Sequence, residues 1–326
     1  MINHNSDLWK YIPEGSTALL WGYNSWYMRF DKFSSLLQKS GIDYYVCPGT
    51  SNWGSFTGRT TNALYNIRRA SDAGKEYGAS GILITDWGNS GNPQFESISY
   101  FGYAVGASYS WNNTPSVIDY DETRSKLSLH DSWKHSYILH INHYNSIHYL
   151  DRVIFNCANA NLGDILYRMG NYIYLESEDI GDSTRCFELY SLGFGKEGYN
   201  MQKGYMMEID PVYYTNIEKY MYSIMEELEG AVPGDELTSL RIKEMICNCR
   251  MTYLLARGLY VQYYYYNDRI DKDVLKKAHD TANMLYEMIE EFKELWVKRS
   301  YPTFMSEAIG HFTRLAVSLK SLEESK

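Results

Sequence analysis

The chain has 326 residues, of which 44% are hydrophobic and 22% are charged, and this globular balance excludes disorder over most of its length. Lys and Arg number 31 against 40 Asp and Glu, so the net charge of −9 provides no basic surface for nucleic acid or anionic membranes. No apolar run approaches the roughly 18–20 residues of a membrane span. The first residues do not resemble a signal peptide, and five Cys favour a reducing compartment, so we expect a cytoplasmic protein.

Short apolar segments alternate with helical patterns in residues 1–113. This alternation predicts βα units and a parallel sheet, with ligands at the carboxyl ends of the strands. Three units predict part of a (β/α)₈ barrel, and because a barrel needs eight strands, we expect another segment or chain to cover the sheet. The expected strands and helices, in chain order, are 17–23, 30–40, 42–49, 62–77, 81–88 and 98–111.

Residues 114–326 have helical spacing of apolar side chains and predict a second, all-α domain. Loops are expected over 175–209 and 231–234, where glycines gather. The fold class predicted is therefore a partial (β/α)₈ barrel followed by a helical domain. The expected helices are 116–145, 147–174, 211–230, 235–265, 271–299 and 302–323.

Each predicted strand ends in a cluster of polar, aromatic and glycine residues, with the sequences WGYN, CPGTSNW and TDWGNSGN. Together with the segment SYFGYAVGASYSWN at 99–112, these clusters resemble the last three βα units of bacterial glycoside hydrolase family 20, the β-N-acetylhexosaminidases. The resemblance covers about a third of the chain in detail, and the helical remainder is loosely similar to the C-terminal extensions of such proteins.

This resemblance implies hydrolysis of terminal N-acetylhexosamine with retention of configuration. In the family, the acetamido oxygen of the substrate attacks C1, a Glu protonates the leaving oxygen, and the adjacent Asp orients the acetamido nitrogen. The implied ligand is a carbohydrate, an N-acetylhexosaminide, and neither a cofactor nor a metal is implied.

Three residues carry the resemblance to the sugar subsite. Trp87 resembles the tryptophan that walls the subsite, and Tyr23 is a candidate for the hydroxyl that binds the acetamido oxygen. Asn89 stands where the family usually has an acid that binds sugar hydroxyls, so a charge-assisted hydrogen bond is lost there.

Four further residues are candidate substrate-binding residues at the strand ends. Trp21 is one of these candidates; we expect Trp53 to stack on sugar, Asp86 to orient its neighbours, and Arg59 to clamp either a loop or a substrate group. For Trp21, Trp53 and Arg59, a purely structural role is an equally good interpretation.

The catalytic Asp-Glu pair of the family is absent from the predicted strand ends. The two Asp-Glu dipeptides, Asp121-Glu122 and Asp235-Glu236, stand at predicted helix starts, where acids cap free N–H groups. The chain therefore resembles the C-terminal part of an enzyme, whether a split gene product, a fragment or a degenerate copy. Its catalytic pair is expected in an upstream half-barrel chain, while self-association is another way to cover the strands.

Three hypotheses on function remain open. The chain contributes the sugar-binding half of a hexosaminidase site, or it is a non-catalytic sugar-binding or protein-interaction scaffold. The third hypothesis, a different kind of hydrolase, depends only on the cluster of His140, His143 and His148, which lacks further metal ligands at suitable spacing. Cys247 and Cys249 are expected to be buried thiols, because residues two apart on a helix point in different directions.

Overall fold

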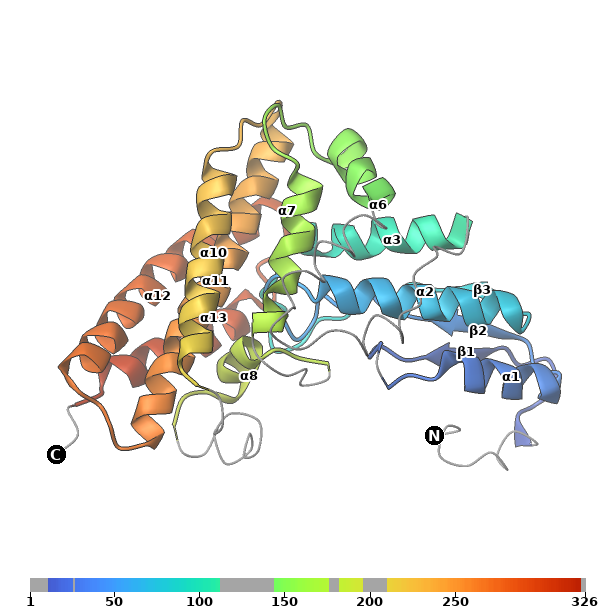
Figure 1. Cartoon of the computed structure of the whole chain (residues 1–326), viewed down its shortest axis with the longest axis horizontal. Helices are drawn as coiled ribbons and strands as arrows, with labels where there is room; N and C mark the ends of the chain where they lie inside the picture. Colours follow the sequence, from blue (N-terminus) through green and yellow to red (C-terminus); the bar gives the residue numbers. More distant parts are fainter. Residues whose placement is uncertain (1–10, 26, 112–143, 176–181, 196–209, 324–326) are drawn as a thin grey trace.

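The computed structural model describes residues 11–25, 27–111, 144–175, 182–195 and 210–323 of the chain. It is mostly helical and contains one small parallel sheet (Figure 1). Expected helix 116–145 lies almost entirely outside the described residues.

The three predicted strands form one parallel sheet in the order β1-β2-β3, as the alternation of strands and helices predicted. The sheet is shorter than predicted, because pairing beyond β3 continues only as a single bridge between Gly49 and Thr85. The chain elements here are β1 (Ala18–Trp21), α1 (Phe30–Ser40), β2 (Tyr44–Cys47), α2 (Thr60–Glu76), β3 (Gly81–Ile82), a 3₁₀ turn (Glu96–Ser99) and α3 (Tyr100–Trp111).

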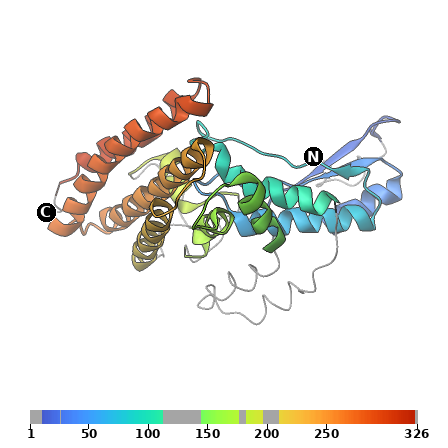
Figure 2. The same cartoon turned by 90° about the horizontal axis from the view of Figure 1, so that it is seen from above.

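One face of the sheet packs on helices, and the other is open. Leu20, Tyr44 and Val46 are buried against α1 and α2. The strands alternate, so their other residues face away from these helices, and there Leu19 and Trp21 are 56% and 60% exposed. Figure 2 shows the strands at the margin of the molecule, with α2 and α3 to one side of them.

The remaining chain forms helices that stand beside the α/β part in Figure 1. The last four match their predicted ranges closely, and α11 and α12 begin at the acidic caps Asp235 and Asp271. The elements are α6 (Tyr144–Tyr149), a π-helical turn (Leu150–Ile154), α7 (Leu162–Met169), a 3₁₀ turn (Gly170–Leu175), α8 (Arg185–Leu192), α10 (Val212–Glu229), α11 (Glu236–Tyr266), α12 (Lys272–Arg299) and α13 (Met305–Lys320).

Two helical predictions need correction. The expected helix 147–174 is broken after residue 154. In the segment that interrupts it, the Asn159 side chain donates to the Gly230 carbonyl at 2.8 Å and accepts from the Val232 N–H at 2.7 Å, so this segment is bound to the end of α10 instead of continuing the helix. The expected loop 175–209 contains α8, whose first turn is capped by Thr184, with its hydroxyl accepting from the Phe187 N–H at 3.2 Å.

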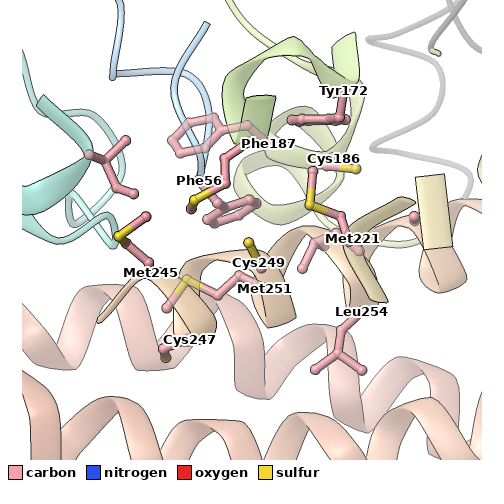
Figure 3. Close-up of a cluster of buried hydrophobic side chains, with 14 of the residues drawn as sticks. Phe56, Tyr172, Cys186, Phe187, Met221, Met245, Cys247, Cys249, Met251 and Leu254 are labelled. Atoms are coloured by element: carbon pink, nitrogen blue, oxygen red, sulfur yellow. The ribbon is translucent and has the colours of Figure 1, made fainter. Parts of the chain in front are cut away.

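The larger of two hydrophobic clusters joins α2 and α3 of the α/β part to the helices, while the smaller one lies between the sheet, α1 and α2. Phe56, from the loop before α2, is fully buried, and its ring centroid lies 5.5 Å from that of Phe187 on α8 (Figure 3). Cys247 and Cys249, on α11, lie in the same core, so the prediction of buried thiols is confirmed.

Among the described residues, no helix has the length and apolar character needed to cross a membrane.

Candidate functional site at the strand ends

Two buried asparagines of α2 hold together the loops that follow β1 and β2. Asn66 donates to the Gly22 carbonyl at 2.9 Å and accepts from the Gly49 N–H at 3.0 Å. One turn earlier, Asn62 donates to the Tyr23 carbonyl at 2.8 Å and accepts from the Ser25 N–H at 2.9 Å. The helix thus fixes the backbone that presents Tyr23.

Trp53 folds back over the end of β2 because Gly49 leaves room for it. A Cβ on Gly49 would lie 2.3 Å from the Trp53 ring, which is closer than any real contact. The indole is only 3% exposed and lies buried beneath the end of β2.

Four aromatic side chains, which we call the aromatic cluster, meet around Tyr23. Its ring stacks on Trp21 at 5.8 Å between centroids and meets Trp53 edge-on at 4.9 Å. Trp87, from the loop after β3, donates its indole N–H to the Tyr23 hydroxyl at 2.8 Å. Trp21 and Trp87 remain 60% and 54% exposed, so two ring surfaces face solvent at the carboxyl ends of the strands.

Asp86 ties the loops after β2 and β3 to α3. Its carboxylate accepts hydrogen bonds from the hydroxyls of Thr50, Ser99 (3.0 Å) and Tyr103 (2.7 Å). Burial and the bond to Asp86 raise the pKa of Tyr103, so this phenol remains a proton donor at neutral pH. The carboxylate is thus occupied by three hydroxyls of the protein.

Arg59 is engaged within the protein. Its guanidinium lies 5.6 Å from the centroid of the Trp53 ring and forms an ion pair with Asp182 at 3.3 Å. The side chain is 2% exposed. Through these contacts it clamps the loop after β2 to the segment before α8.

Asn89 is exposed at a tight turn beside the aromatic cluster, where its carbonyl accepts from the Asn92 N–H at 2.9 Å. The turn runs through three successive residues with positive φ: Ser90 (48°), Gly91 (79°) and Asn92 (46°). Such backbone persists only where surrounding contacts enforce it.

The other candidates give no second site within the described residues. Asp235 caps α11 by accepting from the Thr238 N–H at 2.6 Å, and this bond lowers its pKa. His148 is exposed, and no group of three metal-ligating side chains occurs in the described part of the chain. The remaining candidates lie outside the described residues: Asp121-Glu122, His140 and His143.

Sequence reasoning missed Asn62 and Asn66, which shape the site from behind. A signal was present, since two asparagines four residues apart share one face of a helix whose neighbouring positions are apolar. Buried amides at such positions need partners, and the adjoining loops provide them.

The comparisons with known proteins identify no family for this chain. No protein-family model matches it, and no curated protein is significantly similar to it in sequence.

Proposed function

We propose that the strand ends form the carbohydrate-binding part of a retaining β-N-acetylhexosaminidase site, within the last three βα units of a (β/α)₈ barrel. The observation that carries this proposal is the aromatic cluster, in which the exposed rings of Trp21 and Trp87 both contact Tyr23, the first by stacking on its ring and the second by a hydrogen bond to its hydroxyl. The apolar face of a pyranose packs on such rings, and polar groups between them fix its orientation.

The hydrogen bonding of Tyr23 supports a role towards the acetamido group. The hydroxyl accepts the indole N–H of Trp87, so its own proton is directed elsewhere. A hydroxyl donor beside an exposed aromatic ring suits an acetamido oxygen. Asn89, on the neighbouring turn, offers an uncharged amide to sugar hydroxyls.

The open face of the sheet supports the partial-barrel interpretation. Leu19 and Leu83 are 56% and 44% exposed on the face opposite α1 and α2. In a barrel this face points inward and is covered by side chains of further strands. We propose that those strands, with the Asp-Glu pair, come from elsewhere in the same polypeptide or from another chain.

The proposal is tested by titrating the chain with N-acetylglucosamine and following tryptophan fluorescence. We expect saturable binding that Trp87→Ala weakens at least about tenfold, because burying one large apolar side chain contributes roughly 1.5–3 kcal/mol and 1.4 kcal/mol is tenfold. Trp111→Ala is the matched control, since that indole is 94% exposed at the end of α3. The absence of saturable binding by the unsubstituted chain would contradict the proposal.

Catalysis requires a second measurement. The chain by itself should not hydrolyse an aryl N-acetylglucosaminide above background, because a general acid typically contributes about 10²–10⁴-fold. Rapid turnover by the purified chain would show that an acid–base pair has been overlooked.

A second candidate is a non-catalytic interaction scaffold. It is favoured because the charged groups at the strand ends, Asp86 and Arg59, are already engaged by protein partners. Under this alternative, N-acetylglucosamine leaves the fluorescence unchanged.

A further inference from the structure

The loop after β3, which carries Trp87 and Asn89, is held along its length by the helices of the second half. At its tip, the Tyr190 hydroxyl of α8 donates to the Ser90 carbonyl at 2.7 Å. Beside it, Gly91 touches the first turn of α13 so closely that a Cβ would lie 2.6 Å from the backbone nitrogen of Ala308.

The far end of the same loop enters the helical core. Phe95 is 4% exposed, and its ring centroid lies 5.6 Å from that of Phe292 on α12. Its N–H donates to the Asn248 side chain of α11 at 3.3 Å. Four helices therefore contact one loop of the α/β part.

These contacts account for the unusual backbone of the turn. Ser90 and Asn92 have positive φ without being glycine, a conformation that costs free energy and needs external support. The turn is packed against the base of the loop, since a Cβ on Gly88 would lie 2.7 Å from the Asn92 side chain. The tip therefore packs directly against Gly88, the residue next to Trp87.

We infer that the helical half positions the Trp87 loop for sugar binding, and that Tyr190 is the positioning residue at its tip. This inference rests on the proposed function. Tyr190 suits the role because it is 1% exposed and its ring centroid lies 4.7 Å from that of Phe312, so its hydroxyl is held by a rigid core. Burial raises the pKa of this phenol, which keeps it a donor at neutral pH.

The decisive variant is Tyr190→Phe, which removes only the hydroxyl. Tyr220→Phe is its matched control, because Tyr220 also donates to a backbone carbonyl within the helices, that of Arg168 at 2.9 Å, but does so away from the loop. The readouts are hydrogen exchange of the amides of residues 88–92, the ¹⁹F resonance of 5-fluorotryptophan at position 87, and the dissociation constant for N-acetylglucosamine.

We expect Tyr190→Phe to speed exchange in residues 88–92, to shift the Trp87 resonance, and to weaken sugar binding roughly threefold to tenfold, as suits one lost hydrogen bond. Exchange should increase more in residues 88–92 than in α11, because a general loss of stability alone would not single out the loop. Tyr220→Phe should alter none of the three.

A second pair of variants tests the contact with α13. Gly91→Ala and Gly41→Ala both place a side chain at positive φ, 79° and 68°, but only the first meets another helix. Gly91→Ala alone should displace the Trp87 resonance. The inference is overturned if Tyr190→Phe and Gly91→Ala leave the loop exchange and the Trp87 resonance unchanged. A chain that binds no sugar, yet shows the loop effects, refutes the proposed function and leaves the positioning intact.

Discussion

Asn66 of α2 is a single buried amide that joins the loops after β1 and β2. Its two hydrogen bonds satisfy backbone groups of Gly22 and Gly49 that lie away from water. We predict that Asn66→Ala lowers the free energy of unfolding by about 2–4 kcal/mol, because it leaves a buried donor and a buried acceptor unsatisfied. Urea denaturation measures this loss.

The control for this prediction is Asn283→Ala, at an exposed position of α12 where the amide meets Lys320 at 3.1 Å. Asn283→Ala should change the free energy of unfolding by no more than about 0.5 kcal/mol. Equal losses in the two variants would contradict the role assigned to Asn66.

Burial of the thiols predicts both their reactivity and a dependence of stability on pH. Burial raises the pKa of Cys47 to about 11 and that of Cys247 to about 12, whereas Cys157 is only half-buried. At pH 8, about one thousandth of Cys47 is thiolate, so iodoacetamide should alkylate Cys157 first, as peptide mass spectrometry can show. Rapid modification of Cys47 in the native chain would contradict this order of reactivity. As a control, all five cysteines should react when the chain is unfolded in guanidinium.

The same shifts set the sign of the pH effect. Unfolding restores thiols with a pKa near 8.5, so above about that pH the unfolded state holds fewer protons than the folded state. Both cysteines therefore make stability fall as pH rises from about 8.5 towards 11. Denaturation midpoints measured at pH 8 and pH 10 check the direction.

Among elements, the strands and most long helices followed from the sequence, whereas the contacts between them did not. Gly41 ends α1 with φ of 68°, at the predicted end of that helix, and Asp235 caps α11. Helix α8 escaped prediction because it is only eight residues long and is followed by Gly193. The engagement of Asp86 by hydroxyls from three segments depends on tertiary packing that no local pattern encodes.

The open sheet face gives a prediction at the element scale. Leu19 and Leu83 present apolar surface there, and β1 lies at one edge of the sheet, a combination that favours association. We predict that the chain self-associates unless a partner covers this face, and that the double variant Leu19→Glu, Leu83→Glu shifts it towards monomer in light scattering. The control is Val297→Glu on α12, where the side chain is 54% exposed; this variant should leave the self-association unchanged. A monomeric unsubstituted chain would count against an uncovered barrel face.

For the whole molecule, the shared core predicts that the α/β part and the helices unfold together. Phe56 belongs to the first part by sequence and to the second by contact, since its ring centroid lies 5.3 Å from that of Tyr190 and 5.8 Å from that of Phe312. Figure 3 places it among side chains of the helices. A cavity at this point removes packing from both halves at once.

We therefore predict that Phe56→Ala lowers the free energy of unfolding by about 3–5 kcal/mol and lowers the hydrogen-exchange protection of both α2 and α11. Phe304→Ala is the matched control, because that ring is 68% exposed and its loss opens no cavity. If Phe56→Ala reduced protection in α2 alone, the two halves would be separate cooperative units. The contacts between the helices and the Trp87 loop would then hold the loop in the folded state without coupling the stability of the two halves.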